Sequence, residues 1–267
     1  MDFTDINTRG LVLVGCGRMG GAMLTGWLKS GITPGAVTVI DPNASADWAT
    51  KGVRLNEAPP ANPAVLVLAV KPQMMSDVLP GLEVGADTLV LSVAAGTTIA
   101  TYDQAFPKAR IVRAMPNTPA AIGRGISAII GNAAAGPDAL DMAEGLLSVV
   151  GEVVRLDSED QIDAVTAVSG SGPAYVFHLI EALTAAAQEQ GLTAEMSLQL
   201  ARATVAGAGA LAMADDTSPA ALREAVTSPK GTTAAGLAIL MDPDQGLPPL
   251  IARTVAAAAD RSRELGK

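Results

Sequence analysis

The stretch LVLVGCGRMGG (11–21) decides the fold of the amino-terminal half. An apolar run typical of a buried strand leads directly into Gly15-Cys16-Gly17-Arg18-Met19-Gly20, and a helical pattern follows. In a G-x-G-x-x-G turn the first glycine makes the bend, the second lets the backbone approach a pyrophosphate, and the third brings helix against strand. We therefore predict that residues 15–20 bind a dinucleotide; the alternative is a chance glycine turn.

Apolar runs recur after this turn at 37–40, 64–70, 88–94 and 110–115, with segments of helical length between them. Continuous apolar strands that alternate with helices predict an α/β domain, built on a parallel sheet covered on both faces. After about residue 163 every segment has a helical pattern. We expect a Rossmann-like dinucleotide-binding domain over 1–162 and an all-α domain over 163–267.

The helices expected in the second domain are very rich in alanine, which has little bulk for an isolated core. This composition favours close packing against another subunit, although a self-contained helical bundle is an equal alternative.

Composition limits the function. A net charge of −9 argues against a nucleic-acid partner, which would need basic patches. Gly, Pro or a charged residue interrupts every apolar run before it reaches membrane-spanning length, so no membrane partner is expected. With one cysteine and one histidine, no metal site is expected. No signal peptide is visible, and we expect a cytoplasmic protein.

Asp41 ends the second predicted strand, about where a carboxylate usually binds the ribose of a dinucleotide. A carboxylate accepts from a 2′-hydroxyl and repels a 2′-phosphate, and no Arg or Lys follows in 42–45. This pattern favours NADH over NADPH. The alternative is that Asp41 only caps the following turn.

Five segments together resemble one enzyme family: GCGRMGGA, AVKP, RAMPNTPAAIGRG, VSGSGPAYVFHLIEAL and SPKGTTAAGL, spanning 15–237. They are similar to pyrroline-5-carboxylate reductase, the last enzyme of proline biosynthesis. The resemblance implies reduction of the cyclic imine Δ1-pyrroline-5-carboxylate to L-proline by NADPH or NADH. It also implies a helical domain that forms a homodimer and completes the active site, with assembly into a decamer as a further option.

The resemblance further implies that Asn56, the loop Ala69-Val70-Lys71-Pro72 and the turn Ala94-Ala95-Gly96 contact the cofactor. The two loops also follow predicted strands, where ligands sit in parallel sheets. Lys71 contacts a phosphate or the substrate, or it is simply a solvated lysine; in either case the following proline favours an extended backbone. Asn117, in MPNTP, follows another predicted strand, and we assign it to the same site, where it would hold the nicotinamide amide or the substrate. The alternative is that Asn117 only ties the turn together.

The segment TSPKGTTAAGL (227–237) is the expected substrate site. By resemblance it holds the substrate carboxylate, and the hydroxyl of Thr233, the expected catalytic residue, reaches the ring nitrogen. The start of a helix offers unpaired N–H groups, here at Gly231, Thr232 and Thr233, and Ser228 adds a hydroxyl. The alternative is an ordinary helix cap after a proline turn.

Position 230 departs from the family pattern, because it is Lys where similar proteins usually carry glycine. If that glycine has a positive φ, Lys230 is strained by roughly 1 kcal/mol or more. Lys230 either adds a charge for the carboxylate or is simply solvated.

Two other classes of protein share the glycine turn. A β-hydroxyacid dehydrogenase needs a lysine on the first long helix of its second domain, and no lysine lies between Lys108 and Lys230. A non-catalytic dinucleotide sensor would need no hydroxyl-rich anion site.

Overall fold

The computed structural model describes residues 2–266. Their contacts form two units. The first contains the chain up to Gly170 together with the segment from Ala259 onward, and the second is Ser171–Ala258. Each unit is described by itself.

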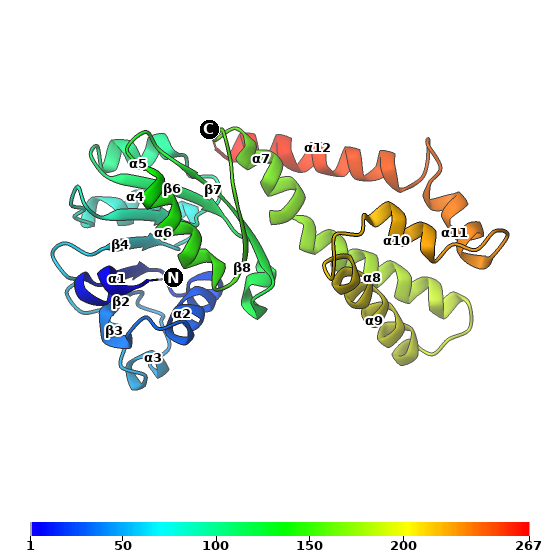
Figure 1. Ribbon diagram of the computed structural model, residues 1–267, viewed down its shortest axis with the longest axis horizontal. Helices are drawn as coiled ribbons and strands as arrows, with labels where there is room; N and C mark the ends of the chain where they lie inside the picture. The colour runs from blue at the N-terminus through cyan, green and yellow to red at the C-terminus, as the bar shows by residue number, and fades with distance from the viewer. Residues whose placement is uncertain (1, 267) are drawn as a thin grey trace. The chain divides into compact units, whose positions relative to one another are not determined.

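The first unit is built on an eight-stranded sheet of order β3-β2-β1-β4-β5-β6-β7-β8 (Figure 1). All neighbouring strands are parallel except β6 and β7. The strands are β1 Leu11–Val14, β2 Val37–Ile40, β3 Arg54–Leu55, β4 Val65–Leu68, β5 Leu89–Ser92, β6 Arg110–Met115, β7 Gly125–Gly131 and β8 Gly151–Arg155.

Helices connect these strands. They are α1 Thr4–Arg9, α2 Arg18–Lys29, α3 Asp47–Thr50, α4 Met75–Val78, α5 Ile99–Ala105, α6 Pro137–Ser148 and α7 Gln161–Val165. Short 3₁₀ turns are η1 Pro34–Ala36, η2 Pro72–Met74, η3 Leu79–Gly81 and η4 Thr118–Ile122, and α7 continues into the π-helical turn η5 Thr166–Gly170.

The strands are apolar on both faces because each face is covered. Leu11 and Leu13 of β1 point to a cluster that contains Trp27 of α2 and Leu146 of α6. Val12 and Val14 point to the opposite cluster, which holds Tyr102 of α5. Successive side chains of a strand alternate between faces, so a run such as LVLV supplies both clusters at once.

The second unit is entirely helical over the residues described. Its helices are α8 Gly172–Glu189, α9 Ala194–Ala212, α10 Pro219–Ala225, α11 Thr232–Leu240 and the first part of α12 Leu247–Leu265. Local caps fix several starts: Ser218 accepts from the Ala221 N–H at the entrance of α10, and Thr193 does the same for Met196 in α9.

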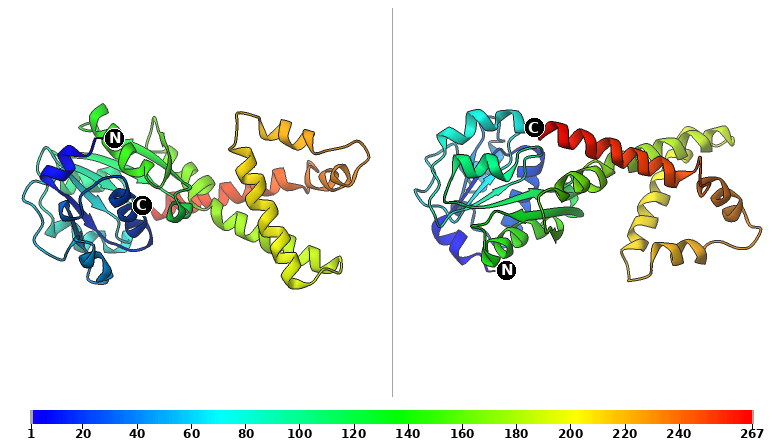
Figure 2. Two further views of the ribbon diagram at one scale, coloured as in Figure 1. Left: turned by 60° about the horizontal axis from the view of Figure 1, so that its bottom comes forward. Right: turned by 90° about the horizontal axis from the view of Figure 1, so that it is seen from above.

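The helices of the second unit bury almost no residues among themselves. Helices α8 and α9 pack against each other (Figure 2). They bury only Ser197 and Ala201 between them, and α10 and α11 bury no residue. Many large apolar side chains are therefore exposed in the single chain, among them Phe177, Leu179, Met196, Leu200, Leu211, Met213, Ile239 and Leu250. The described helices therefore do not form a self-contained bundle, and their exposed apolar side chains are typical of a protein–protein interface.

Two expectations need correction. The sheet is mixed, because β7 runs antiparallel to β6, and sequence analysis did not identify β3, β7 or β8. The compact units also divide at Gly170, and Ala259 onward belongs with the sheet, so 163–267 is not one compact unit. The reason is that α12 is one continuous helix, whose last turns belong to the first unit.

Among residues 2–266, no helix combines the length and the apolar character needed to cross a membrane.

Candidate functional site

The glycine turn has the geometry that a dinucleotide requires. Gly15 has φ 92°, and a Cβ there would lie 2.8 Å from the backbone of Ala69. A Cβ on Gly20 would lie 2.2 Å from the Gly15 carbonyl oxygen, so only glycine lets α2 approach β1. Gly17 is different: a Cβ there would meet nothing within 4 Å. Gly17 therefore borders open space at the first turn of α2.

The amino end of α2 can accept an anion. Gly17 is the cap residue and provides no side-chain hydrogen bond, so the first amides of the helix, at Arg18 and Met19, have no partner within the helix. These N–H groups and the helix dipole favour a phosphate beside Gly17. The residues present fit the pyrophosphate of a dinucleotide.

Asp41 lies directly beside this turn. One carboxylate oxygen accepts from the Cys16 N–H at 2.7 Å, and the other accepts from the Asn43 N–H at 2.8 Å. Asp41 thus caps the turn that follows β2, as its alternative interpretation holds. It also places a negative charge next to the glycine turn, where the ribose assignment requires one.

Asn56 fixes the backbone of Asp41. Its Oδ1 accepts from the Asp41 N–H at 2.9 Å, and its Nδ2 donates to the Asp41 carbonyl at 3.1 Å. Asn56 has φ 51°, a left-handed conformation that asparagine tolerates better than most residues. The exposed side chain thus positions Asp41, and its contact with the cofactor remains a prediction.

The other predicted cofactor loops leave the same edge of the sheet. β1, β4 and β5 are adjacent and parallel, with Val14 opposite Leu68 and Leu68 opposite Ser92. The loops Ala69–Pro72 and Ala94–Gly96 therefore start beside Gly15. The chain reverses its strand order between β1 and β4, which is where ligands bind in such sheets.

Lys71 and Gly96 differ in what they offer. Lys71 is exposed and extended, with φ −64° and ψ 145°, as the following proline dictates. Its carbonyl already accepts from the Met74 N–H. Gly96 has φ 76°, and it shapes the turn after β5.

Asn117 is held from both ends of its amide. Its Oδ1 accepts from the Ile126 N–H at 2.9 Å, and its Nδ2 donates to the Ser169 carbonyl at 3.1 Å. Only 9% of the residue is exposed. These bonds support the structural alternative, in which Asn117 ties the MPNTP turn to β7 and to the SGSGP segment.

The predicted substrate residues lie at the entrance of α11 in the helical unit. Gly231 caps the helix without a side chain, so the amides of Thr232 and Thr233 have no partner within the helix. A Cβ on Gly231 would lie 2.3 Å from the Ser228 hydroxyl, which places that hydroxyl against the same entrance. Ser228, Thr232 and Thr233 are all exposed.

Lys230 has φ 61°, so it adopts the left-handed conformation that glycine would adopt without strain. The loop therefore keeps the backbone expected of the family glycine. The Lys230 side chain is exposed.

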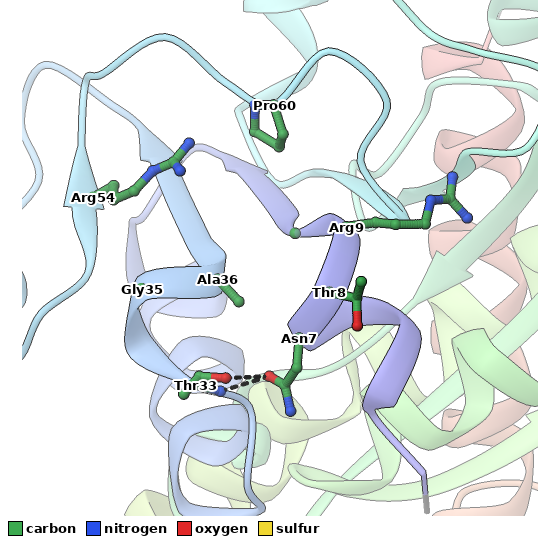
Figure 3. Close-up of a pocket in the computed structure, with 9 residues that line it drawn as sticks. Asn7, Thr8, Arg9, Thr33, Gly35, Ala36, Arg54 and Pro60 are labelled. Carbon is green, nitrogen blue, oxygen red and sulfur yellow. Dashed lines mark hydrogen bonds between the residues drawn. The ribbon is translucent and has the colours of Figure 1, made fainter.

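Two hollows lie outside these groups. A hollow of about 370 Å³ borders Gly10, Ala36 and Pro60 (Figure 3). It faces the amino ends of β1 and β2, the edge opposite the glycine turn, and the Arg9 guanidinium points away from it to the Asp87 carbonyl. A second, apolar hollow lies between α10 and α11, beside Thr227 and Met241. Neither hollow contains a predicted site residue.

Sequence reasoning missed one group of side chains beside the 94–96 turn. Arg113 of β6 donates to Glu159, whose carboxylate also accepts from the Ile99 N–H. Nearby, the Tyr102 and Ser92 hydroxyls are 2.5 Å apart, and burial raises the pKa of Tyr102. No local motif marks these residues, since they come from separate elements.

Comparison with protein families agrees with this geometry. Residues 159–265 match the family model described as pyrroline-5-carboxylate reductase dimerisation. Residues 10–96 match the model described as NADP oxidoreductase, coenzyme F420-dependent. The first match covers the helices that lack an interior, and the second covers the glycine turn, Asp41 and both cofactor loops.

Individual relatives match over nearly the whole chain. A pyrroline-5-carboxylate reductase from Synechocystis is 40% identical over 96% of this chain and 98% of the relative. The solved reductase of Coxiella burnetii is 34% identical, with a TM-score of 0.88 over 97% of this chain and 99% of that one. The pyrroline carboxylate reductase of Plasmodium falciparum, solved with NADP bound, is 26% identical, with a TM-score of 0.81 over 98% and 99%. The chain therefore belongs to the pyrroline-5-carboxylate reductase family.

Proposed function

We propose that this chain reduces Δ1-pyrroline-5-carboxylate to L-proline with NADPH or NADH, as the last step of proline biosynthesis. The observation that carries the proposal is the entrance of α11, where the amides of Thr232 and Thr233 have no partner within the helix and the Ser228 hydroxyl lies beside them, in a chain that matches the family over its length. A small anionic substrate suits such a site without an arginine.

In this proposal the residues of the chain bind and orient the substrate, and none of them exchanges a proton with it. The amides of Thr232 and Thr233 hold the carboxylate, with the Ser228 hydroxyl beside them, and the Thr233 hydroxyl holds the ring nitrogen. The Gly231 N–H, also predicted to bind the substrate, instead donates to the Ser228 carbonyl at 3.0 Å and closes the turn before α11. The reduced nicotinamide supplies the hydride when it is bound. A protonated imine carbon is already electrophilic, so orientation is the main requirement, and no general base is assigned.

On the cofactor side, the glycine turn 15–20 holds the pyrophosphate, and Asp41 and Asn56 lie at the ribose end. The loops 69–72 and 94–96 complete the cofactor site. Asn117 holds the MPNTP turn in place through its hydrogen bonds to Ile126 and Ser169. The carboxylate of Asp41 favours NADH, because it would repel a 2′-phosphate. Kinetics with both cofactors test this preference.

The chain forms homo-oligomers through its helical domain, and we propose a homodimer, with a decamer built from five such dimers as the larger option. The exposed apolar side chains of α8–α12 support the dimer. Sedimentation equilibrium of the purified chain separates monomer, dimer and decamer by mass. We further propose a cytoplasmic location for this enzyme.

The central test is oxidation of NADPH and of NADH on addition of the cyclic imine, followed at 340 nm, with L-proline identified as product. Turnover with proline formation supports the proposal. Cofactor binding without turnover would instead support a dinucleotide sensor. Turnover of a β-hydroxyacid without turnover of the imine would support the dehydrogenase alternative, which lacks its lysine here.

A further inference from the structure

One carboxylate joins three separate segments of the first unit. Glu159, which follows β8, accepts from the Arg113 guanidinium of β6 at 2.5 Å. The same oxygen accepts from the backbone N–H of Ile99 at 2.8 Å. Ile99 is the first residue of α5, immediately after the turn that begins at Ala94.

The Arg113 side chain is only 8% exposed, whereas Glu159 is 31% exposed. A buried guanidinium needs a fixed partner, because an unpaired charge is costly away from water. Glu159 therefore has a strongly preferred position, set by Arg113. That position in turn fixes Ile99.

The other end of the same turn is held as well. The Ala94 N–H donates to the Ser92 hydroxyl at 3.3 Å, and the Ser92 hydroxyl is paired with Tyr102. Hydrogen bonds thus fix the turn between Ala94 and Ile99 at its start, through Ser92, and at its end, through Glu159. Ala95 is the exposed residue between these two hydrogen bonds.

We propose that Arg113 and Glu159 are positioning residues, which hold the 94–98 turn in the position that the nicotinamide requires. This inference rests on the proposed function, which assigns Ala94, Ala95 and Gly96 to the cofactor. Neither charged residue needs to touch the cofactor or the substrate. Hydride transfer is sensitive to small displacements of the nicotinamide. Loss of the hydrogen bonds to the turn should therefore slow the reaction more than it weakens cofactor binding.

The test compares Glu159→Ala, which removes both bonds, with Glu159→Gln, which keeps an oxygen acceptor at the same place. Glu152→Ala, at an exposed glutamate of β8, is the matched control. We expect Glu159→Ala to lower kcat roughly 10- to 100-fold, with a smaller change in cofactor Kd. The deuterium isotope effect on kcat from 4-deuterated cofactor should rise. Glu159→Gln should recover most of the rate, and Glu152→Ala should match the wild type.

A second readout needs no turnover. In the wild type, bound NADPH or NADH should protect the peptide 93–99 from hydrogen exchange, and this protection should be lost in Glu159→Ala and kept in Glu159→Gln. The proposal is overturned if the two variants lose rate and protection equally. It is also overturned if Glu159→Ala lowers only the melting temperature. If the wild type fails to reduce the imine, the proposed function fails, and the exchange measurement still decides whether Glu159 holds the turn.

Discussion

The carboxylate of Asp41 accepts a hydrogen bond from the Cys16 N–H at 2.7 Å, so the end of β2 is tied directly to the glycine turn. This bond fixes a negative charge beside the predicted ribose site. We expect Asp41→Ala to raise the NADPH/NADH ratio of kcat/KM roughly tenfold, equivalent to about 1.4 kcal/mol. Asp41→Asn removes the charge but keeps an acceptor, so it should shift the ratio with less loss of cofactor affinity. An unchanged ratio in both variants would remove Asp41 from cofactor selection.

Substitution by alanine should have different effects on stability and cofactor affinity at Gly17 and at Gly20. Gly17→Ala places its Cβ in open space, so we expect an unchanged melting temperature and a weaker Kd for the dinucleotide. Gly20→Ala places its Cβ 2.2 Å from the Gly15 carbonyl. That overlap should destabilise the fold by about 1–3 kcal/mol. Thermal unfolding and cofactor titration of both variants check this pair. Equal losses of cofactor affinity and stability in the two would contradict it.

Thr233→Ala should lower kcat while cofactor affinity changes little, because Thr233 is assigned to the substrate. Loss of one hydrogen bond to the ring nitrogen, about 1–3 kcal/mol, corresponds to a roughly 5- to 150-fold lower rate. Thr233→Ser keeps the hydroxyl and serves as the control. Steady-state kinetics together with cofactor titration measure both quantities. Lost cofactor binding with normal turnover at saturation would contradict the assignment.

Lys230 combines a positive charge with a left-handed backbone, and two variants separate these properties. Lys230→Gly should relieve backbone strain and raise the free energy of unfolding by up to about 1 kcal/mol, whereas Lys230→Ala keeps the strained φ. If the charge helps to hold the substrate, both variants should raise KM for the imine equally. A KM that is unchanged in both identifies a solvated side chain.

The Cys16 thiol should be unreactive at neutral pH. Burial, with a smaller effect from Asp41, raises its pKa to about 11 from 9.0. The thiolate is the reactive form, so alkylation by iodoacetamide at pH 8 should be about 100-fold slower than for an unperturbed thiol. The rate should rise steeply as the pH approaches 11. Unfolded chain in urea is the control. Rapid alkylation of the folded chain at pH 8 would contradict the burial.

Elements with a strong local signal were predicted correctly. LVLV and VTVI are strands with the expected bounds, because buried parallel strands are continuously apolar. The strand 125–131 was missed because GISAIIG begins and ends in glycine, which weakens any strand pattern.

The site could be predicted only where the motif is local. Gly15, Gly17 and Gly20 act within one turn, so their spacing is visible in the sequence. Arg113 and Glu159 are brought together by the pairing of distant strands, and no periodicity reports such a contact. The bonds that Asn117 makes to Ile126 and Ser169 depend on the same long-range geometry.

The last turns of α12 belong to the sheet unit: the Ser262 hydroxyl donates to Asp163, and the Leu265 carbonyl lies 3.6 Å from where a Cβ on Gly96 would be. A segment that is translated after the helical unit therefore completes the unit that is translated before it. The sheet unit therefore makes its full set of contacts only after the helical unit has been synthesised, although amino-terminal domains usually fold first during synthesis.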